Sequence, residues 1–182
     1  MRHTALLPAT VLLAAFALFG LAAQRPHEQA ASPATTSAPA LTVRGIGVRE
    51  TKFSVADFAS LPRLTITVQD KDDAEVKYEG VAVQDVLTEA GMKFGQSIRG
   101  PRLRDFLLAE SGDSYAVVFA LPEVSDEFAR STVLIADRIN GQPLPERDGP
   151  FRIIAPQDKK HARWIRNVTS LTILSSADPP GK

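Results

Sequence analysis

A basic segment near the C-terminus holds the residues best suited to bind a charged ligand. It spans 157–166 (QDKKHARWIR), surrounds the only Trp of the chain and contains Lys159, Lys160, His161, Arg163 and Arg166. The strand-like sequence GPFRIIAP, just before it, adds Arg152. Arginine makes planar, bidentate contacts with phosphate or carboxylate groups, whereas lysine acts as a mobile point charge. These residues predict a binding site for a small anion.

The same segment has a purely structural interpretation, which the residue types leave open. In that interpretation Lys159 and Lys160 are solvated, and Arg163 and Arg166 pair with nearby acids. Trp164 and Ile165 then belong to the hydrophobic core, as large apolar side chains generally do.

Several other chemistries are excluded or weakly indicated. The chain has no Cys, which excludes disulfides, thiolate nucleophiles and sulfur-ligated metal sites. A Ser–His–Asp triad would have His161 as its only available base, and no Ser lies in a nucleophile elbow. The acidic turn 70–75 is a candidate for a hard cation but lacks the EF-hand pattern, so solvated carboxylates and no metal site are expected.

The charge balance narrows the class of protein. The 182 residues contain 21 Lys and Arg against 21 Asp and Glu. Nucleic-acid binders normally carry a basic excess, so we expect no nucleic-acid partner. An apolar fraction of 44% is too high for a disordered tail.

The N-terminal sequence predicts export. Residues 1–23 combine Arg2, an apolar run and small residues at its end, which is the pattern of a cleaved signal peptide. An uncleaved anchor helix is the alternative. Residues 24–40 are rich in Ala, Ser, Thr and Pro and are expected to form a linker. The folded domain is then 41–182, in the periplasm or secreted by a bacterium, with no membrane span after cleavage.

The pattern of the folded domain predicts an α+β protein with a mostly antiparallel sheet and two or three short helices. About eight strands are expected, with hairpins over 64–79 and 103–121 and a central strand over 132–136. Helices are expected after Ser54, ending before Pro62, and over 83–90, ending at Gly91. Asn140-Gly141 and Asp148-Gly149-Pro150 predict turns.

In order and spacing, several motifs of the chain resemble those of the molybdopterin-binding oxidoreductase domain of the sulfite oxidase family. The resemblance is to the small exported members of that family. The similar blocks lie between about 65 and 173 and are YEGVAVQDVL with Ala90-Gly91, Gly112-Asp-Ser-Tyr115, Leu134-Ile-Ala136, Asn140-Gly-Gln-Pro-Leu144 and GPFRIIAP. Arg163-Trp-Ile-Arg166 falls where the family carries basic residues that help to hold the pterin phosphate.

This resemblance implies the fold and a molybdopterin cofactor, but one expected residue is missing. Catalytic members carry a Cys that binds molybdenum near the position of 68–71, where this chain has VQDK. The absent soft ligand argues against a molybdenum centre.

Three functions therefore remain, and whether the protein is an enzyme stays open. We expect a binding module without molybdenum catalysis, which holds a small anionic ligand or a partner protein of the cell envelope through Arg152 and the basic segment. The alternative is a molybdopterin-dependent oxidoreductase whose metal is held without Cys, by the dithiolene alone or by an oxygen ligand such as Asp70. A third possibility is a structural role in an envelope complex, with the linker as a tether.

Overall fold

The strands of the domain form two sheets, each with five strands. A computed structural model describes residues 40–69 and 74–176. The predicted signal peptide 1–23, the linker up to 39 and Asp70 lie outside the described residues. No helix in the described ranges is long and apolar enough to cross a membrane.

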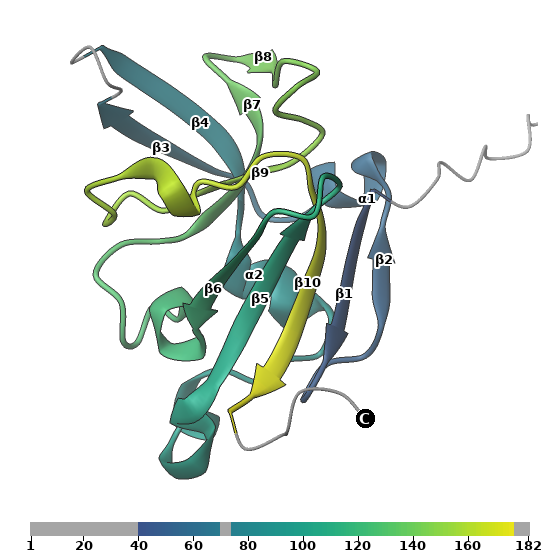
Figure 1. The fold of residues 1–182 in the computed structure, drawn as a ribbon, viewed down its shortest axis with the longest axis vertical. Coiled ribbons are helices and arrows are strands. Elements are labelled where there is room, and N and C mark those ends of the chain that lie inside the picture. The colour runs from purple at the N-terminus through teal and green to yellow at the C-terminus, as the bar shows by residue number, and fades with distance from the viewer. Residues whose placement is uncertain (1–39, 70–73, 177–182) are drawn as a thin grey trace, which may run out of the picture. The chain divides into compact units, whose positions relative to one another are not determined.

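The first sheet contains the two ends of the described chain side by side (Figure 1). Its order is β2 (Thr51–Phe53), β1 (Leu41–Gly45), β10 (Val168–Ser175), β5 (Asp105–Ser111) and β6 (Ala116–Ala120). Only β1 and β10 pair in parallel; the other neighbours are antiparallel. The hairpin between β5 and β6 reaches toward the candidate site described below.

The second sheet is built on a hairpin and a central strand. Its path is β3 (Leu64–Gln69), β4 (Glu75–Ala82), β7 (Leu134–Ile139) and β8 (Gln142–Pro143), and β9 (Arg152–Ile154) also pairs with β7. All of these pairings are antiparallel. The hairpin of β3 and β4 and the central position of β7 confirm the sequence prediction.

Six short helices connect the strands. They are α1 (Val55–Ala59), α2 (Val83–Glu89) and the 3-10 turns η1 (Gly95–Ser97), η2 (Gly100–Arg104), η3 (Leu121–Val124) and η4 (His161–Arg163). Ser54 and Asp57 form a reciprocal capping box at the start of α1, as the sequence pattern predicts. These hydrogen bonds from Ser54, backbone first, lower the pKa of the Asp57 carboxyl.

The hydrophobic core follows from the alternation of the strands. In β5, Leu107 and Ala109 are fully buried, while their neighbours in sequence are half-buried on the opposite face. Phe58 of α1 and Phe151 next to β9 have ring centroids 4.4 Å apart inside this core. The core thus fixes the start of β9, where Arg152 of the predicted anion site lies.

The α+β class with mostly antiparallel sheets is confirmed, whereas some of the predicted strands differ in detail. The ten observed strands exceed the expected eight because β2 and β8 have only three and two residues, too few for a recognisable alternation. The central strand begins at Leu134 and continues to Ile139, beyond the apolar run that marked it in the sequence.

One glycine of the Tyr-x-Gly block is required by the packing of two strands. Gly80 of β4 lies against β7, where a Cβ would overlap the backbone oxygen of Ile135. The pairing of β4 with β7 shifts register at this point, between Glu79 and Gly80. A backbone atom cannot move away without breaking the ladder, so only glycine fits here.

We therefore expect Gly80→Ala to lower the free energy of unfolding by more than about 2 kcal/mol, since overpacking forces the strands apart. Urea unfolding followed by circular dichroism measures this. Gly100→Ala is the control, because no atom lies within 4 Å of its added Cβ and only its positive φ of 56° opposes the change. Equal losses in both variants would contradict the packing explanation.

Candidate functional site

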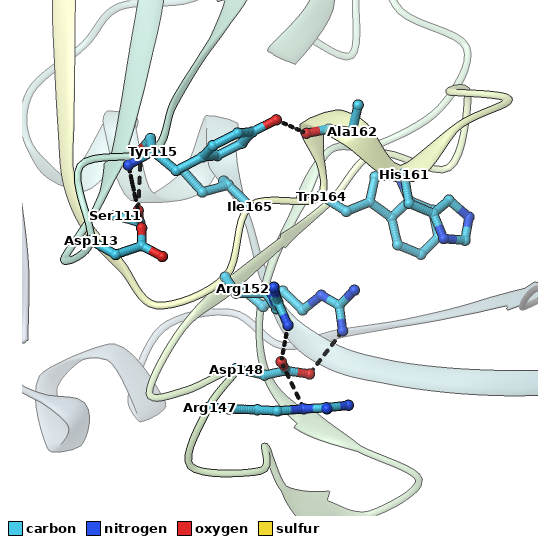
Figure 2. A pocket seen from close by; sticks show the side chains of 11 residues that line it. Ser111, Asp113, Tyr115, Arg147, Asp148, Arg152, His161, Ala162, Trp164 and Ile165 are labelled. Atoms are coloured by element: carbon cyan, nitrogen blue, oxygen red, sulfur yellow. Dashed lines mark hydrogen bonds and ion pairs between the residues drawn. The ribbon is translucent and has the colours of Figure 1, made fainter.

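A pocket of about 510 Å³ opens where three segments of the chain meet (Figure 2). The segments are the hairpin of β5 and β6, the turn that leads into β9, and η4 with the residues after it. The lining residues are Ser111, Asp113, Tyr115, Arg147, Asp148, Arg152, His161, Ala162, Trp164, Ile165 and Arg166. Sites for small molecules generally have volumes of roughly 300–1,000 Å³, so the pocket has a suitable size.

A buried carboxylate surrounded by arginines forms the floor of the pocket. The side chain of Asp148 is only 6% exposed. Its oxygens lie 3.0 Å from Nη1 of Arg152, 3.5 Å from Nη1 of Arg166 and 3.6 Å from Nε of Arg147. A buried carboxylate is unfavourable unless it is paired, and Arg152 is the closest of the three cations that pair with it.

The charge of the lining is positive. Three arginines face two aspartates, Asp113 and Asp148, which leaves an excess of one positive charge while His161 is neutral. The two outer guanidinium groups are accessible, because the Arg166 and Arg147 side chains are 54% and 79% exposed. The pocket is therefore complementary to an anion.

Arg152 is the most buried cation of the pocket. Its side chain is 17% exposed, and its guanidinium carbon lies 5.7 Å from the ring centroid of Tyr78 on β4. Its Nε is buried without a hydrogen-bond acceptor among the described residues. An unpaired buried donor of this kind costs free energy.

Three aromatic side chains also line the pocket, those of His161, Trp164 and Tyr115. The ring of His161 stacks on Trp164, with centroids 3.6 Å apart and planes 13° from parallel. Trp164 is fixed because its Nε1 donates to the backbone oxygen of Ala155 at 2.8 Å. Tyr115 donates from its hydroxyl to the backbone oxygen of Ala162 at 2.9 Å, which joins the hairpin to η4.

The hairpin contributes the second carboxylate. Asp113 accepts hydrogen bonds from the hydroxyl of Ser111 and from the backbone N–H of Tyr115. The Ser111 hydroxyl above all, and then the N–H of Tyr115, lower the pKa of the Asp113 carboxyl, and the charge of Arg166 acts in the same direction. Asp113 is thus an anion that faces the arginines across the pocket.

The predicted site residues separate into two groups. Arg152, His161 and Arg166 come together in the pocket. Lys159 and Lys160 are exposed and are not among the lining residues. The expectations that Trp164 and Ile165 are core residues and that Arg166 pairs with an acid are confirmed, since the first two are 6% and 2% exposed.

Arg163 lies outside the pocket and holds together three other parts of the fold. It binds Asp158 at 2.6 Å and Glu123 at 3.3 Å, and it donates to the backbone oxygen of Val118 at 3.2 Å. Its guanidinium also lies 4.5 Å from the ring centroid of Phe119. Asp158 above all raises the pKa of Arg163. This is the structural pairing that the sequence left open.

Among the lining residues that the sequence does not single out as a site are Asp113, Tyr115, Arg147 and Asp148. The sequence places Asp148 in a turn, where a spacing of four residues does not bring side chains together as it does on a helix, so no local signal indicates its ion pair with Arg152. Tyr115 belongs to a hairpin far away in the sequence, and nothing local indicates that it reaches η4. In the described ranges, no group of three or more His, Cys, Asp or Glu side chains is arranged to hold a metal ion.

Comparison with known protein families identifies the fold. The family model described as "Oxidoreductase molybdopterin binding domain" matches residues 29–180. The chain belongs to this family. The resemblance noted in the sequence is thereby confirmed, and the molybdopterin-binding domain fold positions the pocket described above.

A solved structure supports the same fold. The sulfane dehydrogenase SoxCD from Paracoccus pantotrophus is similar with a TM-score of 0.58 and 21% sequence identity. The match covers 76% of this chain but only 39% of that chain. At this identity the similarity shows the fold alone. No curated protein matches at a significant level.

The pocket fits part of the cofactor that the family name implies. A pterin with a phosphate group needs cationic donors and a flat surface, and the pocket offers the accessible Arg147 and Arg166 and the stacked His161 and Trp164. The chain has no Cys, so it has no thiolate to offer to a metal. The residues therefore fit an anion or a pterin phosphate and do not fit a thiolate-bound metal.

The placement of Arg163 leads to a prediction about stability. Arg163→Ala removes charged hydrogen bonds and leaves Asp158, whose side chain is 14% exposed, without its main partner. We expect the free energy of unfolding to fall by about 2 kcal/mol. Lys160→Ala, at an exposed neighbour, is the control and should change stability by less than about 0.5 kcal/mol. A stable Arg163→Ala protein in urea unfolding would contradict the structural role.

Proposed function

We propose that this protein is an exported binding module of the molybdopterin-binding domain family, in the periplasm or secreted, and that its pocket holds a small anionic ligand without molybdenum catalysis. The observation that carries the proposal is the arginine cluster around Asp148, which keeps one positive charge in excess inside a pocket of suitable size. The N-terminal sequence 1–23 supports export.

The arrangement of the cluster favours ligand binding over a purely structural role. A single carboxylate would be satisfied by one bidentate arginine, yet three guanidinium groups converge on Asp148. Arg147 and Arg166 each approach only one oxygen, at 3.6 and 3.5 Å, so both keep donors for another acceptor. An anion that enters the pocket would add acceptors without breaking the contact of Arg152 with Asp148.

The second candidate is an oxidoreductase that uses molybdopterin with a metal site lacking Cys. Membership of the family favours this candidate because its relatives are named for that cofactor. In both candidate functions the same arginines would hold the anionic group. The two candidates therefore share the binding site and differ in whether a metal-dependent reaction takes place there. A partner protein of the cell envelope is compatible with either candidate.

Anion binding by the pocket is tested by isothermal titration calorimetry with sulfate. Arg166→Gln and Arg147→Gln each remove an accessible cation, and we expect each to weaken sulfate binding by roughly three- to tenfold. Arg138→Gln is the matched control, because Arg138 is exposed on β7, does not line the pocket and donates to the backbone oxygen of Gly141. Unchanged affinity in both pocket variants would disprove the proposed site.

The two candidate functions are separated by elemental analysis and pterin fluorescence on protein purified from the envelope fraction of its native host. We expect neither molybdenum nor pterin in amounts comparable to the protein. Molybdenum close to one atom per chain would favour the oxidoreductase, despite the missing Cys. Pterin without molybdenum would identify the anionic ligand and retain the binding module.

A further inference from the structure

One edge of the second sheet is unpaired and carries no charge. β3 pairs with β4 on one side only (Figure 1), and in the described ranges its residues make no hydrogen bond or ion pair outside that pairing. Its sequence, LTITVQ, contains neither a charged residue nor a proline. Such an edge presents free backbone N–H and C=O groups to a strand of another molecule.

The other sheet edges in the described part of the chain are short or covered. β2, β8 and β9 have only two or three residues each. At β6, the side chains of Arg163 and Glu123 bind backbone groups of Val118 and Ala120. β3 has six residues, so a strand added to this edge would gain the most main-chain hydrogen bonds.

The apolar side chains of β3 lie on one face. Ile66 and Val68 are half-buried and pack against the core. Leu64 lies on the same face because side chains alternate along a strand, and it is 41% exposed. A strand with apolar residues on this face would cover Leu64 and extend the core beyond β3.

The opposite face of the hairpin carries charges beside the threonines of β3. Thr65 lies opposite Glu79 of β4, and Thr67 lies opposite Lys77. Residues that are opposite in a ladder share a face, so both charges lie on the face of the exposed threonines. A partner strand must therefore bring a positive charge into the row of Glu79 and a negative charge into the row of Lys77.

A second copy of the same hairpin meets this requirement in one antiparallel register. With the two-fold axis at Ile66, Thr65 of one copy lies opposite Thr67 of the other. Each row across the interface then runs from Glu79 of one copy to Lys77 of the other, over three strand spacings, about 14 Å. With the axis at Thr67, one row would instead join the two copies of Lys77, and like charges are unfavourable.

The register centred on Ile66 also matches the apolar face. Ile66 lies opposite its own copy, and Leu64 of one copy lies opposite Val68 of the other. Pairs of aliphatic and β-branched residues across neighbouring strands stabilise a sheet. The sequence of β3 is thus complementary to itself on both faces.

We propose that two copies of the chain associate through β3, in an antiparallel pair with two-fold symmetry that joins their second sheets into one. This interface goes beyond the proposed function, because β3 contributes no residue to the anion pocket. Each copy covers the free edge of the other, so the assembly closes at two copies.

Sedimentation velocity of the full chain tests the association. We expect a dimer whose share rises with protein concentration, without larger species. The double variant Thr65→Lys, Thr67→Lys places lysines directly opposite each other across the interface, and it should weaken the dimer by roughly tenfold. The matched control Thr65→Lys, Thr67→Glu places opposite charges at the same positions and should retain the dimer. A monomeric wild type, or equal effects of the two double variants, would overturn the proposal.

The register is tested by disulfide formation, because the chain has no Cys of its own. In the proposed pair, residue 66 lies about 5 Å from its copy between Cα atoms, whereas residue 67 lies about 8 Å from its copy. A disulfide requires Cα atoms within about 7 Å. On mild oxidation we therefore expect a cross-linked dimer of Ile66→Cys and none of Thr67→Cys. Any other result would overturn the proposed pairing.

Two further measurements separate a lost interface from other defects. Urea unfolding of each variant establishes that a monomer is still a folded protein. Sulfate binding by the Thr65→Lys, Thr67→Lys variant should equal that of the wild type, since β3 does not line the pocket. Failure of the dimer with intact sulfate binding would reject this inference alone, and a dimer without sulfate binding would reject the anion site alone.

Discussion

The carboxylate of Asp148 is almost completely removed from water, and its charge must be balanced inside the protein. Charge of this kind is tolerated only when cations and hydrogen-bond donors are held in place around it. The cations come from its immediate neighbour Arg147, from Arg152 on β9 and from Arg166 before β10. The backbone oxygen of Asp148 also accepts from the N–H of Asn167 at 2.9 Å. One buried group therefore ties the turn before β9 in the second sheet to the entry of β10, the middle strand of the first sheet.

The segment between β9 and β10 supplies both core residues and the arginines that pair with buried or half-buried acids. Its Trp164 and Ile165 enter the core, and its arginines point to opposite sides. Arg166 meets Asp148 at the pocket, whereas Arg163 meets Asp158 and Glu123 beside β6. The segment is thus held by ion pairs on both sides, and His161, two residues before Arg163, is stacked on the ring of Trp164. A site built in this way is organised before any ligand arrives, which reduces the entropy cost of binding.

Much of the fold could be predicted from the sequence because its signals are local. The alternation of apolar and polar residues in 64–79 predicts the hairpin of β3 and β4, and the capping box at Ser54 predicts the start of α1. The order and spacing of the sequence motifs indicate the family, which the family model confirms. The sites of Arg152, His161 and Arg166 could be named because basic side chains around a single Trp are unusual in a neutral chain. The directions in which Arg163 and Arg166 point could not be predicted, since a 3-10 turn followed by an irregular stretch obeys no simple periodicity. Nor could the contact of Tyr115 with Ala162, because it joins residues 47 positions apart.

The surroundings of Arg163 also affect how the first sheet ends. β6 is an edge strand, and an edge offers free backbone groups to any strand of another molecule. Here Arg163 donates a hydrogen bond to the carbonyl oxygen of Val118, and the Glu123 carboxylate accepts one from the N–H of Ala120 at 2.7 Å. Two side chains of opposite charge thus take the place that a foreign strand would need. Arg163, which lies outside the pocket, thereby helps to block the edge of β6 against pairing with a strand of another molecule.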